Sequence, residues 1–224
     1  MAMVLLVRHG QAAFGTEHYD RLSDQGRQQA RWLGEYLAAR GLRFRTVVAG
    51  TLARQRDTAA ELLSAMALPE LPIQTDAGLN EYDGEALYAR FTGGADQRAH
   101  QVRDFRDYWR IFREAMKAWS EDRLAQMPET WAQFGERVRS AVDTASAGAS
   151  REEVVLLVSS GGAIGRLVAD IVAAPASTAI ELNLQFRNTG VCELIAGGGA
   201  LRLLSYNNVP HLDHPDRRQA ITFA

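Results

Sequence analysis

The stretch Val4-Leu5-Leu6-Val7-Arg8-His9-Gly10 joins a wholly apolar run to a cation, an imidazole and a glycine. A short apolar run of this kind predicts a strand buried on both faces, as in the parallel sheets of α/β proteins. Such sheets bind their ligands beyond the carboxyl ends of the strands. Arg8, His9 and Gly10 therefore predict a site at the sheet edge, where the Arg8 guanidinium suits an anion. A polar strand end with a solvated histidine is the alternative that these residues alone leave open.

The segments that follow alternate between helices and strands. Ser23 is a suitable N-cap for a helix that runs to about Arg40, with Gly41 at its C′ position. The alternation of strands and helices predicts an α/β fold. The predicted elements after this helix are strands over 46–49 and 71–75 around a helix over 53–66, a strand over 154–158, a helix over 163–172, and strands over 190–195 and 201–206 around the turn at 197–199.

The segment from about 85 to 125 interrupts the alternation and predicts a helical cap inserted into a single domain of residues 1–224. Apolar residues recur in it at steps of three and four, as on one helix face: Val102, Phe105, Trp109, Phe112, Met116 and Trp119. A basic stripe follows one residue later and comprises Arg103, Arg106, Arg110, Arg113 and Lys117. The stripe is either a solvated surface, partly neutralised by Asp104, Asp107 and Glu114, or the face of a cap that meets an anionic ligand.

The composition narrows the class of protein without naming its function. The chain has 224 residues, is 46% hydrophobic and has a formal net charge of −2, so no general basic surface points to nucleic acid or to a membrane as partner. Cys192 is the only cysteine, which excludes an internal disulfide and a cysteine-built zinc site. No apolar run approaches the roughly 20 residues of a membrane span. We expect a cytoplasmic protein.

Three later junctions also place chemically useful residues at strand ends. Arg54 stands near the start of a predicted helix, whose N-terminus favours an oxyanion. Glu81 lies in a polar turn, where a carboxyl of raised pKa can protonate the leaving oxygen of a phosphate ester. The turn Ser159-Ser160-Gly161-Gly162 offers backbone amides and a hydroxyl. Alone, Glu81 reads as an ordinary turn acid and the serine turn as a helix cap; together, they suit a neutral His9 that attacks phosphorus.

The order of these junctions resembles that of the histidine phosphatase superfamily, the phosphoglycerate-mutase-like proteins. The resemblance runs from Met3 to about Leu212 and includes segments 22–30, 188–191 and 208–212. It implies a three-layer α/β/α fold with a mostly parallel central sheet, and a hydrolase of histidine acid phosphatase type that forms a phosphohistidine without a metal or other cofactor. By position, the implied catalytic residues are His9 as nucleophile, Arg8 and Arg54 as phosphoryl-binding groups, Glu81 as proton donor, and Ser160. The expected phosphate-binding residues are Arg8, Gly10, Gln11, Arg54 and Gly161.

The chain departs from the family pattern in the turn after the late strand. Family members usually carry there a second histidine that touches the phosphoryl oxygens, whereas this chain has Ser160. A hydroxyl in place of a cationic donor weakens one hydrogen bond by about 1–2 kcal/mol, or about five- to thirtyfold in rate. The loss is larger if the histidine also orients His9. A compensating imidazole is open: His100 and His211 are the candidates, and His18 and His214 remain in principle.

Residues expected near the substrate differ as well. Mutases carry a hydroxyl residue and then Trp-Asn where this chain has Ala12, Ala13, Phe14 and Gly15, and Gly50 replaces the serine that often begins the turn before the second arginine. These changes favour a phosphomonoester hydrolase with a small phosphorylated substrate over a phosphoglycerate mutase. A weakly active or inactive protein that binds a phosphorylated ligand, or acts as an interaction module, is the alternative. A monomer and a homodimer both stay open.

Two other chemistries fit the serine turn poorly. Ser160, Asp213 and His214 have the chain order of a serine hydrolase, but Val158 breaks the Gly-x-Ser-x-Gly pattern and an adjacent acid and histidine rarely share a triad. Residues 161–165 suggest a dinucleotide-binding loop, yet their spacing differs from the fingerprint and they follow a late strand rather than the first.

Overall fold

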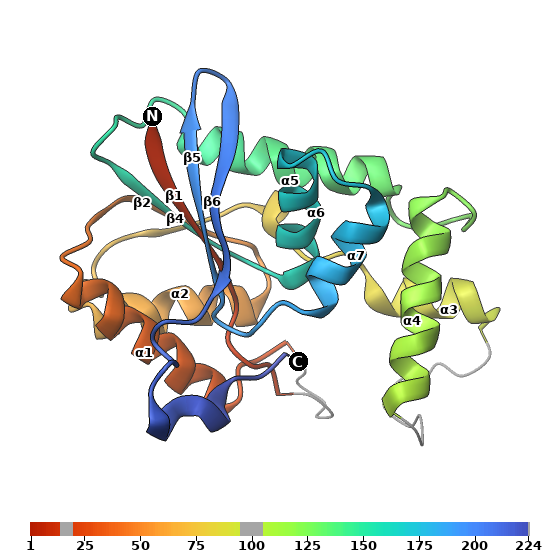
Figure 1. Cartoon of the computed structure of the whole chain (residues 1–224), viewed down its shortest axis with the longest axis horizontal. Helices are drawn as coiled ribbons and strands as arrows, with labels where there is room; N and C mark the ends of the chain where they lie inside the picture. The colour runs from red at the N-terminus through yellow and green to blue at the C-terminus, as the bar shows by residue number, and fades with distance from the viewer. Residues whose placement is uncertain (14–19, 95–104, 224) are drawn as a thin grey trace.

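The structure, a computed structural model, describes residues 1–13, 20–94 and 105–223. A six-stranded sheet forms its centre, in the order β3-β2-β4-β1-β5-β6 (Figure 1). The parallel strands are β1 (Ala2–Arg8), β2 (Phe44–Ala49), β3 (Ile73–Thr75) and β4 (Val154–Ser159). β5 (Val191–Gly197) and β6 (Ala200–Asn208) join them in antiparallel pairs. The expected α/β fold is confirmed, with a sheet that is mixed at one edge.

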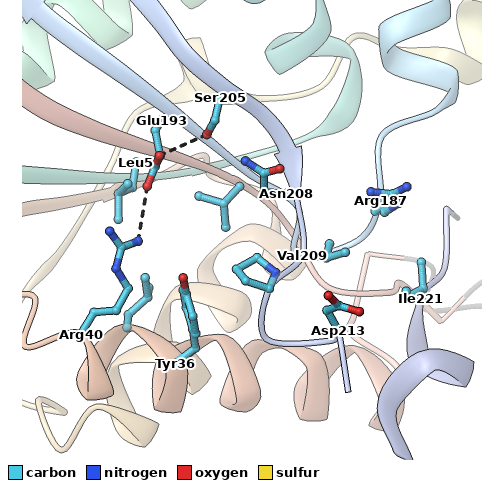
Figure 2. A pocket seen from close by; sticks show the side chains of 13 residues that line it. Leu5, Tyr36, Arg40, Arg187, Glu193, Ser205, Asn208, Val209, Asp213 and Ile221 are labelled. Carbon is cyan, nitrogen blue, oxygen red and sulfur yellow. Dashed lines mark hydrogen bonds and ion pairs between the residues drawn. The ribbon is translucent and has the colours of Figure 1, made fainter. Parts of the chain in front are cut away.

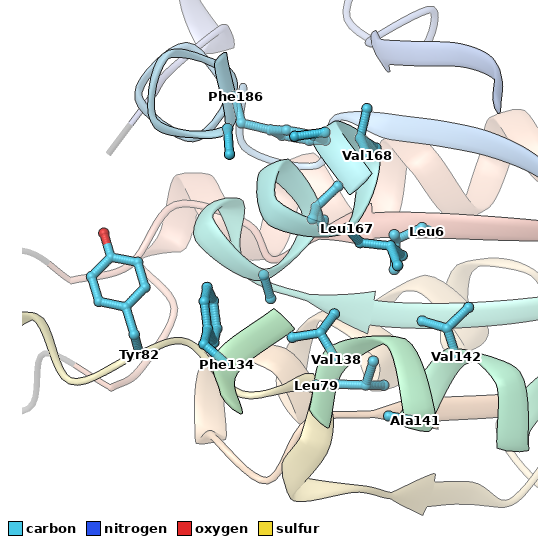
Figure 3. Close-up of a cluster of buried hydrophobic side chains, with 14 of the residues drawn as sticks. Leu6, Leu79, Tyr82, Phe134, Val138, Ala141, Val142, Leu167, Val168 and Phe186 are labelled. Atoms are coloured by element: carbon cyan, nitrogen blue, oxygen red, sulfur yellow. The ribbon is translucent and has the colours of Figure 1, made fainter. Parts of the chain in front are cut away.

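The strands send alternate side chains into two hydrophobic cores. Leu5 and Val7 belong to the core that includes α1 (Asp24–Ala39) and α2 (Ala53–Ala65). Val4 and Leu6 belong to the core on the opposite face, with α5 (Trp131–Ser146), α6 (Gly161–Ile171) and α7 (Ala176–Leu184). Figure 3 shows Leu6 in this second core beside Leu167. Because successive residues of a strand point to opposite faces, a sheet covered on both sides requires an unbroken apolar run.

The first helix has the capping residues that the sequence predicts, whereas α6 does not begin where expected. Ser23 caps α1 by accepting a hydrogen bond from the Gly26 amide, and Gly41 adopts a φ of +69° beyond its end. The predicted start of α6 at residue 163 is wrong: the helix begins at Gly161, with Ser160 as N-cap. The two glycines enter the first helical turn despite their weak helix propensity. Helices α5 and α7 are absent from the elements predicted above.

Helices α3 (Gly84–Thr92) and α4 (Phe105–Ser120) lie on the side of α7 away from the sheet (Figure 1). The apolar face of α4 is confirmed at Phe112, Met116 and Trp119, which are buried; Val102 lies outside the described residues. The basic stripe is exposed at Arg110, which pairs with Asp107 at 3.2 Å, and at Arg113, which pairs with Glu181 of α7 at 2.7 Å. This stretch of the stripe behaves as a solvated, partly neutralised surface; Arg103 and Asp104 also lie outside the described residues.

Short 3₁₀ helices complete the described chain at Ala77–Leu79 (η1) and Pro215–Ala220 (η3). The first leads into the turn that carries Glu81, and the second lies near the end of the chain. No helix in the three described ranges is long and apolar enough to cross a membrane. The limits of the domain and of its insertion stay predictions.

Candidate active site

The register of the sheet brings the strand-end residues together. Arg8 pairs with Ser159 across β1 and β4, and Ala49 pairs with Val158 across β2 and β4. The chain then leaves each strand at the same edge: the His9 amide donates to the Ser159 carbonyl at 2.9 Å. Parallel strands end on one side of a sheet, so three turns distant in sequence meet there.

His9 is held with one ring nitrogen ready for chemistry. Its Nδ1 lies 2.7 Å from the Gly10 carbonyl, which can only accept, so Nδ1 carries the ring proton. Its Nε2 is therefore unprotonated and accepts from Arg54 Nε at 3.2 Å. Burial, with the Arg54 and Arg8 guanidiniums, lowers the His9 pKa well below 6.5. The imidazole is neutral at physiological pH, as a nucleophile must be.

The backbone around His9 is fixed by buried polar groups from distant segments. The His9 carbonyl accepts from the Thr189 amide at 3.3 Å and from Asn188 Nδ2 at 3.2 Å. The Gly10 amide donates to Thr58 Oγ1 at 3.0 Å. A Cβ on Gly10 would stand only 3.0 Å from the Gly26 Cα, so the turn crosses α1 at a distance that only glycine permits.

The two arginines already engage protein oxygens. Arg54 lies in the first turn of α2 and is buried; its Nη1 pairs with Asp20 at 2.8 Å. The other Asp20 oxygen accepts from the Ala53 amide at 2.8 Å, so this carboxylate lies at the N-terminus of α2, where an oxyanion is favoured. Arg8 Nη1 donates to the carbonyls of Phe186 and, at 2.6 Å, Phe223. Sequence reasoning did not identify Asp20, because an acid between predicted elements carries no recognisable signal.

Glu81 reaches the same edge from the turn after η1. Its Oε2 accepts from the Gly162 amide at 2.9 Å, and its Oε1 from the Tyr82 amide at 3.3 Å. Burial raises the Glu81 pKa above 4.5, although these hydrogen bonds and the two arginines oppose the shift. A carboxyl that holds its proton more strongly than usual, at the same sheet edge as a neutral imidazole, can serve as a proton donor.

The remaining expected residues take different positions. Ser160 is fully buried, and its Oγ accepts from Gln55 Nε2 at 2.9 Å. Gly161 follows it as the first residue of α6. Gln11 turns toward α1, where its Oε1 accepts from Ser23 Oγ at 2.8 Å. The structure thus brings His9, Arg54, Glu81 and Ser160 to one edge of the sheet, and the roles expected for them stay predictions.

The described histidines do not take the place of the missing one. His211 Nε2 lies 2.8 Å from Oγ1 of Thr189, whose amide donates to the His9 carbonyl, and burial with the nearby Arg217 charge lowers the His211 pKa to about 3. It is therefore neutral and bonds to Thr189 rather than to Ser160. His214 is exposed at the surface, 3.5 Å from Asp216. His18 and His100 lie outside the described residues.

A groove of about 760 Å³ lies on the α1 side of the molecule, apart from this edge. Figure 2 shows Tyr36 of α1 and Arg40, the C-cap residue that follows this helix, facing Glu193 and Ser205 of the antiparallel strands across it. Arg40 and Ser205 both contact the Glu193 carboxylate. Asp213 also lines this groove, which separates it from Ser160 and removes the basis for a serine triad.

Solved structures of several enzymes share this fold. A phosphoglycerate mutase from Bacillus anthracis superposes with a TM-score of 0.67 at 18% identity, over 94% of both chains. A phosphoserine phosphatase from Entamoeba histolytica gives a TM-score of 0.66 at 16% identity, over 95% of this chain and all of that one. A mycobacterial glucosyl-3-phosphoglycerate phosphatase gives 0.66 at 24% identity, over 93% and 98%. Phosphatases and mutases therefore share the architecture.

Sequence relatives point the same way. The 2,3-bisphosphoglycerate-dependent phosphoglycerate mutase of Brucella ovis is 26% identical over 196 residues, which are 84% of this chain and 88% of that protein. The same enzyme of Methylobacterium sp. is 32% identical over 116 residues, and the match spans 48% of this chain and about half, 54%, of that protein. The family model of the histidine phosphatase superfamily (branch 1) matches residues 4–209. That match takes in every turn of the sheet edge described above, and this chain belongs to the histidine phosphatase superfamily.

Proposed function

We propose that this protein is a metal-independent phosphomonoester hydrolase that works through a phosphohistidine at His9. The observation that carries the proposal is the state of His9: Nδ1 is protonated against the Gly10 carbonyl, and Nε2 presents its lone pair beside Arg54. Nucleophilic catalysis needs an unprotonated nitrogen at the reacting position. A ring held only for packing has no need of a fixed tautomer between two guanidiniums.

In the first step, His9 Nε2 attacks phosphorus and the bond from phosphorus to the ester oxygen breaks. Arg54 Nε turns from Nε2 to a phosphoryl oxygen, and Arg8 neutralises charge on the same group. The departing oxygen takes the proton of Glu81, whose raised pKa favours its protonated form. The products are phosphohistidine, a free alcohol and a Glu81 carboxylate.

In the second step, water attacks phosphorus and gives one proton to the Glu81 carboxylate. The bond between phosphorus and Nε2 breaks, its electron pair returns to His9, and inorganic phosphate leaves. Both groups end as they began, so the cycle needs no further reactant. The substrate of the proposed reaction is a small phosphorylated molecule.

Two other candidate functions, a mutase and a noncatalytic phosphate-binding protein, differ from the hydrolase in what they require of His9. A phosphoglycerate mutase would return the phosphoryl group of His9 to a phosphoglycerate rather than to water, as the names of the curated relatives suggest for those proteins. A noncatalytic phosphate-binding protein would need the arginines but no nucleophile. Two observations support this noncatalytic candidate. Arg54 pairs with Asp20, and neutral Ser160 occupies the position of the second catalytic histidine.

Incubation of the wild type and His9→Ala with a panel of phosphomonoesters tests the proposal. We expect phosphate release by the wild type, loss of it in His9→Ala, and an acid-labile phosphoenzyme on rapid quenching that His9→Ala lacks. His214→Ala, which removes an exposed histidine, is the matched control and should retain activity. Equal phosphate release by wild type and His9→Ala would overturn the hydrolase, and phosphoryl transfer to added phosphoglycerate in preference to water would favour the mutase.

A further inference from the structure

Gln55 connects the segment before Glu81 with the serine turn at Ser160, and the proposed mechanism gives it no role. It follows Arg54 in the first turn of α2, and its side chain is fully buried. Its Nε2 donates to the Leu79 carbonyl at 3.1 Å and to Ser160 Oγ at 2.9 Å. Because the Leu79 carbonyl can only accept, the amide orientation is determined, and the Ser160 hydroxyl oxygen accepts a hydrogen bond from Gln55 Nε2.

Ser160 therefore keeps its own hydroxyl proton for another acceptor. Over residues 1–13, 20–94 and 105–223, no hydrogen bond donated by Ser160 Oγ is found. Its neighbours define where an acceptor fits: a Cβ on Gly161 would lie 3.5 Å from Arg8 Nε, and the Gly162 amide contacts Glu81. A phosphoryl oxygen between Arg8 and Glu81 suits this unused donor.

Gln55 also accounts for the glycine at position 50. A Cβ on Gly50 would collide with the Gln55 amide oxygen, so no side chain fits there while Gln55 is present. That oxygen is buried and has no hydrogen-bond partner among the described residues. Gly50 and Ser160, the two residues that depart from the family pattern, thus lie at opposite ends of the Gln55 amide: Gly50 near its oxygen and Ser160 at its nitrogen.

We propose that Gln55 is a positioning residue that fixes the Ser160 hydroxyl, and that the pair replaces the second histidine with a neutral donor to a phosphoryl oxygen. The inference rests on the proposed phosphoryl chemistry. It has a steric consequence as well. A histidine ring at position 160 would extend from its Cβ through the position of Oγ, where Gln55 lies 2.9 Å away. A histidine at 160 and Gln55 therefore exclude one another.

A double-mutant cycle tests the hydrogen bond. Gln55→Met keeps the length of the side chain but donates nothing, and Ser160→Ala removes the hydroxyl. Each is expected to lower kcat/KM by about three- to tenfold, mainly through kcat, and the double variant should lose no more than either single. The inference is wrong if Gln55→Met keeps the wild-type kcat/KM while Ser160→Ala loses it, or if the two losses multiply.

A second set of variants tests the exclusion. Ser160→His alone should lower the melting temperature and leave kcat/KM unimproved. Ser160→His combined with Gln55→Ala should recover stability, raise kcat/KM above that of Gln55→Ala, and add an ionisation to the pH profile that Gln55→Ala lacks. A merely structural Gln55 would not move that profile. A stable and faster Ser160→His single variant contradicts the inference.

Binding of inorganic phosphate, measured by calorimetry, separates the two proposals. The hydrolase is wrong if His9→Ala and wild type release phosphate alike, whatever the calorimetry gives. The positioning role is supported if Gln55→Met and Ser160→Ala each weaken phosphate binding by about three- to tenfold. Suppose that the wild type binds phosphate and hydrolyses esters through His9, but both variants keep its phosphate affinity. That result overturns the role of Gln55 and leaves the hydrolase proposal standing.

Discussion

The surroundings of His9 and Glu81 shift the pKa values of these two residues in opposite directions. His9 is neutral because burial and two guanidiniums lower its pKa, whereas burial raises the pKa of Glu81 above its ordinary value. A base and an acid whose pKa values move in opposite directions from their surroundings are the usual mark of assigned catalytic roles. The proposed mechanism needs unprotonated His9 with protonated Glu81. Activity should therefore fall at low pH as His9 gains a proton and at high pH as Glu81 loses one.

Glu81→Gln tests that assignment. Glutamine keeps an oxygen to accept from the Gly162 amide but has no acidic proton to transfer to the leaving oxygen, so we expect kcat/KM to fall by about 10²- to 10⁴-fold. The fall at high pH should vanish with it, while the fall at low pH, which belongs to His9, remains. Glu85→Gln, an exposed acid in the first turn of α3, is the control and should behave as wild type. A Glu81→Gln enzyme with wild-type rate and profile would remove Glu81 from the mechanism.

The sequence predicts His9, Arg54 and Glu81 at one edge because each follows a recognisable strand. It does not predict Gln55, whose role is decided by Leu79 and Ser160, 24 and 105 residues away in the chain. A glutamine inside a helix is unremarkable in composition and in periodicity. Only the pairing of β2 with β4 brings its amide against the serine turn. Positions that depend on contacts of this kind lie beyond what local patterns contain.

Among the elements, α5 shows what an unpredicted helix can contribute to a site. The signal was present in the sequence, as a capping box between Thr130 and Gln133 before the buried Phe134 and Val138. The sequence did not indicate which segment α5 contacts, because Arg137 of this helix bonds to the turn at 78–80, far away in the chain. Helix boundaries nearer the site were predictable to within a few residues, whereas the glycines that open α6 obscured its start.

Arg137 links α5 to the turn that carries Glu81. Its guanidinium donates to the carbonyls of Gly78 at 2.9 Å and Asn80 at 2.8 Å, and pairs with Glu129 at 2.7 Å. We expect Arg137→Met to lower the free energy of unfolding by about 1–3 kcal/mol and to reduce kcat, because the turn loses the donors that fix it. Urea unfolding and steady-state rates measure both effects.

Arg139→Met is the matched control for Arg137, because Arg139 stands on the same helix in an exposed pair with Asp143. It should change stability by no more than about 0.5 kcal/mol and leave kcat unaltered. If Arg137→Met is destabilised but turns over at the wild-type rate, the position of Glu81 does not depend on α5.

On the scale of the whole molecule, one short apolar strand determines where everything else lies. The run that ends at Val7 contributes side chains to both cores, and the residues after it include His9, the proposed nucleophile. Its unbroken apolar run predicts its burial on both faces, and the alternation of strands and helices along the chain predicts the fold class. The antiparallel edge of the sheet could not be predicted in the same way, because the residue pattern of β5 does not indicate in which direction this strand runs beside β1. Polar groups buried at this centre then make the stability of the whole fold depend on pH.

His211 makes that dependence measurable. Its pKa is lowered to about 3 by burial and by the Arg217 charge, whereas an unfolded histidine titrates near 6.5. Above pH 6.5 both states are neutral and the native state keeps its full stability. As pH falls from 6.5 toward 3, only the unfolded state binds this proton, so stability falls by about 1.4 kcal/mol per pH unit from His211.

His211→Gln should therefore flatten the pH profile of unfolding by about 1.4 kcal/mol per pH unit between pH 6 and 4. Glutamine does not titrate and can still donate to Thr189 Oγ1, which His211 Nε2 contacts at 2.8 Å. His9 and Glu81 contribute alike in both proteins and cancel in the difference. At pH 8 the difference reports only altered contacts and serves as the internal reference. Parallel urea-unfolding profiles from pH 8 to 4 would show that His211 is not the buried neutral group that couples this fold to acid.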